Sequence, residues 1–204
     1  MWSFGSLLLN IPIIIYVILS SKAPSDFAER IGYINDNWII YSAHWKLEFL
    51  FMTMITIGAV SFAFNLKKAS WPWISVGQII LLMTYPLMLG AYHNTSIEIA
   101  DMANQIAVVI FIFGNIVLLS GLFHLYWTDT ILQKWLRYTA ILLSGFATII
   151  FCIVYVGVIS WRQAMMIGPL INILYLINAF YGWKLTPPST RSIPLKNPAS
   201  STRR

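Results

Sequence analysis

The sequence predicts an all-α integral membrane protein, a bundle of about six transmembrane helices with one amphipathic helix on its outer face between spans 1 and 2. Composition gives the first reason, because charged residues make up only 10% of the chain, against about 25% in a soluble domain. So few charges cannot cover a surface in water, and the apolar exterior must therefore face lipid. The second reason is six apolar stretches, each close to the roughly 20 residues that a helix needs to cross the hydrocarbon core.

The apolar stretches are separated by short polar segments, and tryptophans stand near most of their ends. Tryptophan favours the membrane–water interface, so its placement supports these boundaries independently. The first stretch is the shortest and carries Asn10 and Pro12, which predicts a kinked or tilted helix. The six predicted spans are 3–20, 46–66, 71–92, 102–127, 135–160 and 162–183. Together they make up a predicted transmembrane domain over residues 1–184.

Lysine and arginine predict the orientation, because they concentrate in the cytoplasmic segments of membrane proteins. With the N-terminus inside, nine of these 13 residues lie in cytoplasmic segments. We therefore expect both termini in the cytoplasm and the chain in the cytoplasmic or plasma membrane, and we expect no nucleic-acid partner. Residues 185–204, rich in Pro, Ser, Thr, Lys and Arg, are predicted to form a disordered basic cytoplasmic tail.

The loop between the first two spans carries a helical pattern. Its large apolar residues recur at spacings of three and four, which is the stripe of an amphipathic helix. Pro24 precedes Ser25 and Asp26, either of which can cap the start of a helix. The stripe residues are Phe27, Ile31, Ile34, Trp38, Tyr41 and Trp45. We expect a helix over residues 25–44 that lies on the outer membrane surface or covers the bundle.

Polar residues gather at the predicted outer ends of spans 2, 3 and 4. His44 and Glu48 are four residues apart, hence on one helical face. Ionisable groups at membrane depth are costly, so each is a candidate site residue. The sequence predicts an outer polar or ligand site whose candidate residues are His44, Glu48, His93, Glu98, Asp101, Asn104, Gln105 and Asn115.

This polar group has more than one chemical interpretation. Imidazoles and carboxylates together can bind a divalent metal or act as general acid and base. The chain has no HExxH or CxxC motif, so we assign no metal ligand, no cofactor and no catalytic residue. The alternative, which the sequence favours, is a solvated surface in which His44 and Glu48 form an interfacial pair.

Small residues predict where helices pack closely. Gly114 and Gly121 are seven residues apart on one face of span 4, and small residues let helix backbones approach in a membrane. Span 6 carries a second such face, which includes an asparagine able to hydrogen-bond across the gap. Its members are Gly168, Asn172, Tyr175, Ala179 and Gly182.

Three function classes follow, and we favour one without enzymatic activity. The favoured class is an accessory subunit or a lipid- or small-ligand-binding membrane protein, with membrane lipids, other membrane subunits or further copies of itself as partners. The second is a carrier or channel for a small neutral or amphipathic solute, with a path lined by Gln78, Asn104, Gln105, Asn115 and Asn172. The third is a membrane-embedded enzyme that uses the outer His, Glu and Asp side chains.

Overall fold

The computed structural model describes residues 1–93, 96–160 and 167–185, and all regular structure within these ranges is helical. The predicted tail therefore lies almost wholly outside the described residues. The helices are α1 (Trp2–Leu8), α2 (Asn10–Lys22), α3 (Phe27–Asp36), α4 (Trp38–Leu66), α5 (Ser70–Leu82), α6 (Thr84–Ala91), α7 (Ile97–Thr128), α8 (Lys134–Tyr155) and α10 (Gly168–Leu185).

Among the described residues, five helical stretches are long and apolar enough to cross a membrane. They are Trp2–Lys22, Trp38–Leu66, Ser70–Ala91, Ile97–Thr128 and Lys134–Tyr155. Only 28% to 44% of each apolar window is buried inside the bundle. Because the remaining apolar surface cannot face water without large cost, it faces lipid, and the chain is a polytopic membrane protein.

The sixth predicted span, 162–183, is only partly described. Residues 161–166 lie outside the described ranges, and α10 covers Gly168–Leu185. This helix is not among the five long apolar stretches. The all-α membrane bundle is therefore confirmed for five candidate spans.

Two of the membrane stretches are broken, each four residues before a proline. The α1–α2 break follows Leu8, four residues before Pro12, and α5 ends at Leu82, four residues before Pro86. Proline has no N–H to donate and its ring clashes with the carbonyl four residues earlier, which explains both positions. Near the first break, Asn10 Nδ2 donates to the Ser6 carbonyl at 2.9 Å and to the Leu7 carbonyl at 3.1 Å, which satisfies its own amide donors inside the membrane.

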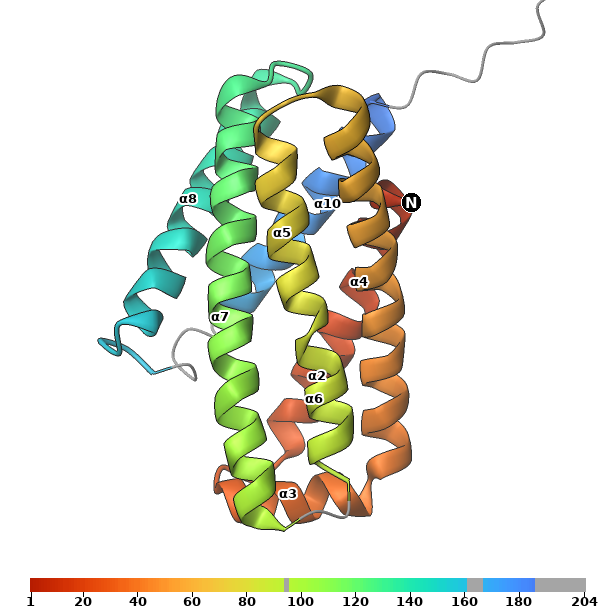
Figure 1. Ribbon diagram of the computed structural model, residues 1–204, viewed down its shortest axis with the longest axis vertical. Helices are drawn as coiled ribbons and strands as arrows, with labels where there is room; N and C mark the ends of the chain where they lie inside the picture. The colour runs from red at the N-terminus through yellow and green to blue at the C-terminus, as the bar shows by residue number, and fades with distance from the viewer. Residues whose placement is uncertain (94–95, 161–166, 186–204) are drawn as a thin grey trace, which may run out of the picture.

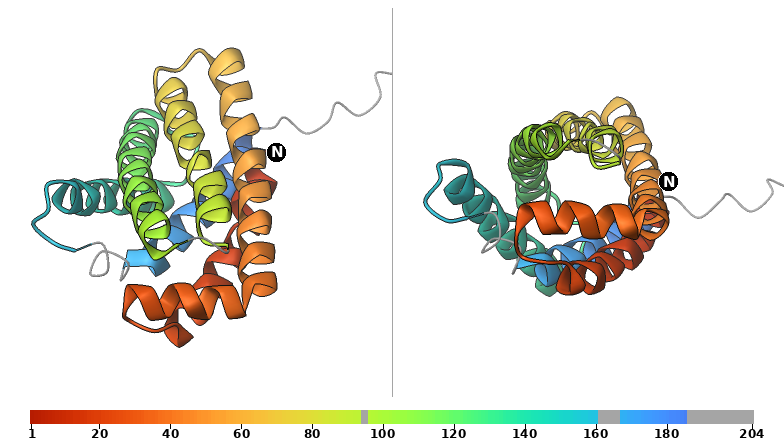
Figure 2. Two further views of the ribbon diagram at one scale, coloured as in Figure 1. Left: turned by 60° about the horizontal axis from the view of Figure 1, so that its bottom comes forward. Right: turned by 90° about the horizontal axis from the view of Figure 1, so that it is seen from below.

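The helices are arranged around a common axis. In Figure 1, α4, α5, α6 and α7 stand side by side along the long axis, and α1, α2 and α10 cross behind them. Figure 2 shows the resulting ring from one end, with α8 packed outside it against α7 and α10. We call the end crossed by α3 the α3 end, and the opposite end, where α7 meets α8, the Asp129 end (Figure 1).

The α3 end contains the predicted amphipathic stripe, with one difference in its bounds. The predicted helix over 25–44 is divided at Asn37, and residues from Trp38 onward already belong to α4. Asp26 caps α3 by accepting from Glu29 N at 3.1 Å. The inward stripe residues pack with loop and helix residues of the α3 end in one apolar cluster, whose buried members are Ile31, Ile34, Tyr41, Trp45, Tyr92 and Ala100.

Glycines allow the closest helix contacts. A Cβ on Gly77 of α5 would lie 2.5 Å from the backbone nitrogen of Leu118 in α7, far inside van der Waals contact. A Cβ on Gly58 would lie 2.5 Å from Trp2 N. Close backbone approach of this kind increases van der Waals contact between helices. Such packing drives helix association in lipid, because the lipid tails are as apolar as the helix faces and the hydrophobic effect does not contribute.

Candidate functional site

His44 lies inside the bundle rather than on a wet surface, and Glu48 is partly buried beside it. The His44 side chain is 2% exposed, and its Nε2 lies 3.6 Å from Glu48 Oε2, beyond hydrogen-bond distance. Both side chains project from one face of α4, with Met52 four residues further along. On the other side of the imidazole, the Tyr16 ring of α2 stacks at 5.9 Å. The solvated interfacial pair favoured by the sequence is therefore wrong for His44.

Two tyrosines extend this polar group toward the middle of the bundle. The Tyr85 hydroxyl, from α6, interacts with the Glu48 carboxyl. Tyr175, from α10, lies near Glu48 and beside Gln78 of α5. The Tyr175 hydroxyl also contacts Met52 Sδ at 3.9 Å. Side chains from five helices thus meet here, and we call them the central polar group: Tyr16, His44, Glu48, Gln78, Tyr85 and Tyr175.

Several polar atoms in the central polar group have no hydrogen-bond partner in the part of the chain that the structure describes. Gln78 is 0% exposed, and neither its Oε1 nor its Nε2 has a partner with full hydrogen-bond geometry, although the Tyr175 hydroxyl interacts with this amide. Neither ring nitrogen of His44 makes one. More than 90% of buried polar groups in proteins are hydrogen-bonded, so two such side chains in one place call for a partner from outside the chain.

The other residues of the predicted outer site do not join the central polar group. The His93 ring stacks on Trp38 at 4.3 Å. Asp101 accepts a 2.8 Å hydrogen bond from Gln105, which lies on the exposed side of α7. The structure therefore divides the predicted site, leaving His44 and Glu48 in the interior.

The amides predicted to line a path are mostly satisfied locally. Asn104 accepts a 2.6 Å hydrogen bond from the Tyr92 hydroxyl, and Asn115 donates to the Phe111 carbonyl of its own helix at 2.8 Å. Asn172 keeps a buried Oδ1 that has no hydrogen-bond partner. Of the five predicted lining residues, Gln78 alone belongs to the central polar group as defined above.

The donor set does not resemble a metal centre. Within residues 1–93, 96–160 and 167–185, no three His, Cys, Asp or Glu side chains lie together as a metal site requires. In the central polar group, one imidazole and one carboxylate stand among phenols and an amide. These groups suit hydrogen bonding to a small organic molecule better than coordination of a transition metal.

The predicted packing residues occupy different surroundings. A Cβ on Gly114 would lie 2.9 Å from the Leu81 side chain, and a Cβ on Gly121 would lie 2.9 Å from Ile74, so both face α5. A Cβ on Gly182 would meet Ser3 Oγ at 2.3 Å, while Gly168 has nothing within 4 Å. Ala179 is 1% exposed.

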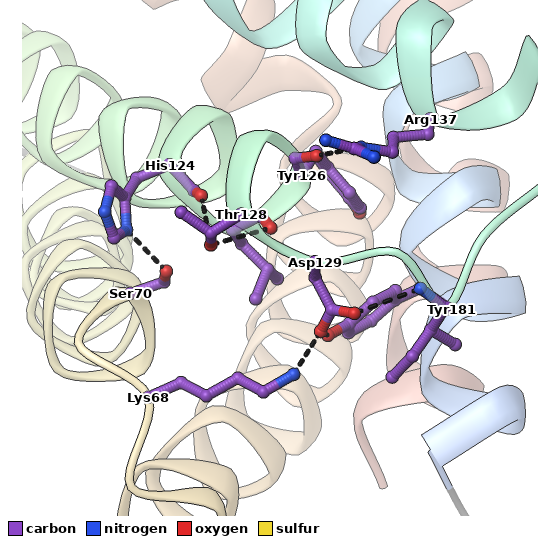
Figure 3. Close-up of polar contacts among 10 residues, drawn as sticks. Lys68, Ser70, His124, Tyr126, Thr128, Asp129, Arg137 and Tyr181 are labelled. Atoms are coloured by element: carbon purple, nitrogen blue, oxygen red, sulfur yellow. Dashed lines mark hydrogen bonds and ion pairs between the residues drawn. The ribbon is translucent and has the colours of Figure 1, made fainter. Parts of the chain in front are cut away.

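A second polar cluster, which sequence reasoning did not identify, closes the Asp129 end. Figure 3 shows the Asp129 carboxylate between two donors, the Lys68 ammonium and the Tyr181 hydroxyl, the latter at 2.5 Å. The backbone N–H of Ile131 donates to the other carboxylate oxygen at 3.0 Å. Asp129 thus joins the α4–α5 connection, the α7–α8 connection and α10.

The charge of Asp129 is stabilised by these bonds. Burial raises the pKa of the carboxyl, but the hydrogen bonds from Lys68, Tyr181 and the Ile131 N–H outweigh it, and the pKa is lowered overall. Nearby, Arg137 Nε donates to the Tyr126 carbonyl at 2.8 Å, satisfying the last turn of α7 (Figure 3). The cluster is a structural clamp between helix ends.

One sequence signal pointed to this part of the bundle. Tyr175, Asn178 and Tyr181 follow one another at spacings of three on α10, so they share a helical face. Asn178 accepts from the Tyr126 hydroxyl through its side chain, and its carbonyl accepts from Trp2 Nε1 at 2.9 Å. Polar side chains therefore line the inward face of α10 from the central polar group to Asp129.

Comparison of this chain with protein-family models, with curated proteins and with solved structures gave no match. The function must therefore be inferred from the geometry of the two polar clusters.

Proposed function

We propose that this chain is a membrane-embedded binding protein for a small, hydrogen-bonding amphipathic molecule held by the central polar group. The observation that carries the proposal is Gln78, which is fully buried and whose two amide atoms lack a partner with full hydrogen-bond geometry, the Tyr175 hydroxyl beside it leaving at least one of them unpaired. Leaving a buried amide unpaired costs about 1–3 kcal/mol, so a partner from outside the chain is favoured. His44, with two unpaired ring nitrogens, adds a second point of attachment.

The chemistry of the central polar group defines the class of ligand. The amide, phenol and imidazole groups offer both donors and acceptors. The acidic side chain among them is Glu48, whose carboxyl group favours a neutral or cationic ligand over an anion. Phe49, whose ring lies 5.6 Å from that of Tyr85, and Met52 supply apolar contact. An amphipathic amine, amide or alcohol meets all of these requirements.

Native mass spectrometry tests this proposal on protein extracted gently from its own membrane. We expect the wild-type chain to carry a small non-protein mass, and Gln78→Leu to lose it. Gln105→Leu is the matched control, because Gln105 pairs with Asp101 on the exposed side of α7. A bare wild-type chain, or equal retention in Gln78→Leu, would contradict the proposal.

A carrier for the same kind of molecule is the second candidate, and the polar face of α10 supports it. That face runs from Tyr175 through Asn178 to Tyr181, which gives a polar route toward the Asp129 end. Transport requires that water reach this route in some state of the protein. A static binding protein has no such requirement, so accessibility separates the two candidates.

Cysteine labelling measures this accessibility. Ser75 of α5 is 6% exposed and lies one turn from Gln78, and Ser75→Cys changes only oxygen to sulfur. Ser144→Cys in α8 is the matched control, because Ser144 is also buried and, like Ser75, donates to a carbonyl of its own helix, but it is not next to the central polar group in sequence. With exposed Cys152 replaced by serine, labelling of position 75 alone by a membrane-impermeant thiosulfonate supports the carrier. Complete protection of both positions contradicts it.

We further propose that α10 is the sixth span and that the Asp129 end faces the cytoplasm. The support is charge, because Lys67, Lys68, Lys134, Arg137 and Lys184 belong to segments at that end (Figure 1), as the positive-inside rule requires. Membrane lipids and further copies of the chain are the proposed partners. A reporter fused after Arg204 should be active on the cytoplasmic side, and activity on the opposite side would contradict this orientation.

A further inference from the structure

Two pockets meet beside the clamp at the Asp129 end. The first has a volume of about 320 Å³ and the second about 360 Å³. They share Ala69 and His124, so the imidazole stands where one pocket passes into the other. The first is lined by Lys68, Ala69, Ser70, His124, Thr128 and Asp129. The second is lined by Ala69, Trp73, Ser120, Gly121 and His124.

The first pocket presents donors suited to an anion. Lys68 is 40% exposed in its side chain and gives one hydrogen bond to Asp129, while an ammonium group has three donors. Ser70 Oγ lies 2.7 Å from His124 Nδ1 and fixes the ring, whose other nitrogen points away from Ser70 (Figure 3). In the tautomer in which Ser70 donates to Nδ1, His124 Nε2 carries a proton and is a donor.

The start of α5 adds to the attraction for an anion. Ser70 is the first residue of α5, and the preceding Ala69 has no side chain able to cap the helix. The helix dipole favours an anion at this end, while in the first turn the Trp71 N–H already donates to the Lys68 carbonyl at 3.2 Å and Pro72 has no N–H to offer. Because Ala69 lines both pockets, this helix start belongs to the same site as Lys68 and His124.

Asp129 does not oppose an anion as strongly as a free carboxylate would. Its Oδ2 accepts from Lys68 and from Tyr181, and its Oδ1 accepts from Ile131 N. Three donors therefore already balance its charge. Lys68 is held in place by this pair, which reduces the entropy lost when it meets a ligand.

The second pocket shows what the anion is attached to. It follows the contact of α5 with α7, where Gly121 removes the bulk of a side chain. Its rim residue Trp73 is 62% exposed on the lipid-facing surface of a candidate span. Tryptophan at such a position lies at headgroup level. A molecule with its anionic group in the first pocket can therefore rest its apolar part along the second.

We infer that this end of the bundle binds the phosphodiester of an anionic membrane lipid, with the phosphate at Lys68 and His124 and the start of the acyl chains over Gly121 and Trp73. This site is separate from the central polar group. It takes an anionic ligand, whereas the central polar group favours a neutral or cationic one. Its occupant is a structural or regulatory lipid, because the site opens on the bundle surface rather than into its interior.

Native mass spectrometry of the full chain in detergent, titrated with dioleoylphosphatidylglycerol, tests the inference. We expect His124→Ala and Lys68→Gln each to weaken binding about tenfold, as loss of one charge-assisted hydrogen bond predicts. Lys134→Ala is the matched control, because Lys134 is an exposed cation at the start of α8 that lines neither pocket. Its binding should stay within about twofold of the wild type. Lys68→Gln also breaks the clamp, so a second variant is needed. His124→Gln keeps a polar group beside Ser70 and should weaken lipid binding by the same factor.

Two further probes identify the source of the phosphate. Dioleoylglycerol, which has the same chains but no phosphate, should bind at least about tenfold more weakly than the phospholipid. Inorganic phosphate at millimolar concentration should not displace the lipid, because it lacks the contacts of the second pocket. Equal binding of the two lipids, full displacement by inorganic phosphate, or equal weakening in Lys134→Ala would each overturn the inference.

Discussion

Replacing Gln78 by leucine should change stability in opposite directions depending on whether the central polar group is occupied. Leucine has a similar volume and no polar atom, whereas Gln78 is 0% exposed and its two amide atoms lack a partner with full hydrogen-bond geometry. In the empty protein the substitution removes a buried unsatisfied amide, so it should raise the free energy of unfolding by about 1–2 kcal/mol. In the occupied protein it removes both the amide and its bound partner, so it should lower that free energy.

Tryptophan fluorescence during thermal unfolding in detergent measures this difference, since the chain has nine tryptophans. The unfolding midpoint is compared between protein as extracted and protein washed extensively with fresh detergent. For a chain of this size, about 1–2 kcal/mol corresponds to a shift of roughly 2–8 °C. Gln105→Leu, on the exposed side of α7, should stay within about 0.5 kcal/mol in both samples. The same shift of Gln78→Leu before and after washing would refute the reasoning.

Three other predictions concern the framework of the bundle. Asp129→Asn should lower the free energy of unfolding by about 1–3 kcal/mol at neutral pH, because buried Tyr181 loses its carboxylate acceptor. Folding lowers the pKa of Asp129. The stabilisation that this carboxylate gives the folded protein is therefore fully present above its pKa in the unfolded chain, near 4. It is lost as the pH falls through the lower pKa of the folded protein. Acid-induced unfolding should therefore be less steep in Asp129→Asn than in the wild type, and an unchanged profile would contradict the assignment. Gly77→Ala should lower the free energy of unfolding by about 1–3 kcal/mol, because the added Cβ clashes with the α7 backbone. Gly90→Ala, whose Cβ meets nothing within 4 Å, should raise that free energy by up to about 1 kcal/mol. Equal effects of the two substitutions in thermal unfolding would count against the α5–α7 packing. Lys67 ends α4 with a φ of 49°, a left-handed conformation that glycine adopts without strain. Lys67→Gly should therefore raise the free energy of unfolding by about 0.5–1 kcal/mol. A lower free energy of unfolding in the same measurement would contradict this.

The membrane helices could be predicted because their signal is carried by many residues at once. Composition and hydropathy average over about 20 positions, so five candidate spans agree with the sequence to within a few residues at most ends. The proline breaks at Pro12 and Pro86 follow a local steric rule, but the sequence interpretation used only Pro12. The division at Asn37 was missed because the apolar stripe continues across it from α3 into α4.

The candidate site could be predicted only in part, since it depends on contacts between distant segments. His44 and Glu48 were found because they are ionisable groups on one helical face at the outer entry of predicted span 2. Tyr85 and Tyr175 carry no such signal, and tyrosine in an apolar helix usually marks packing or an interface. The Asp129 clamp joins residues 61 and 52 positions apart, and no local pattern predicts such pairs.

The most direct test of the central claim is an electron-density map of the protein extracted without harsh detergent treatment, resolved well enough to show small molecules around Gln78. We expect density for a non-protein organic group within hydrogen-bond distance of the Gln78 amide and directed toward His44 and Glu48. Density for ordered water alone, or a Gln78 side chain hydrogen-bonded fully to its protein neighbours, would contradict a bound ligand in the central polar group.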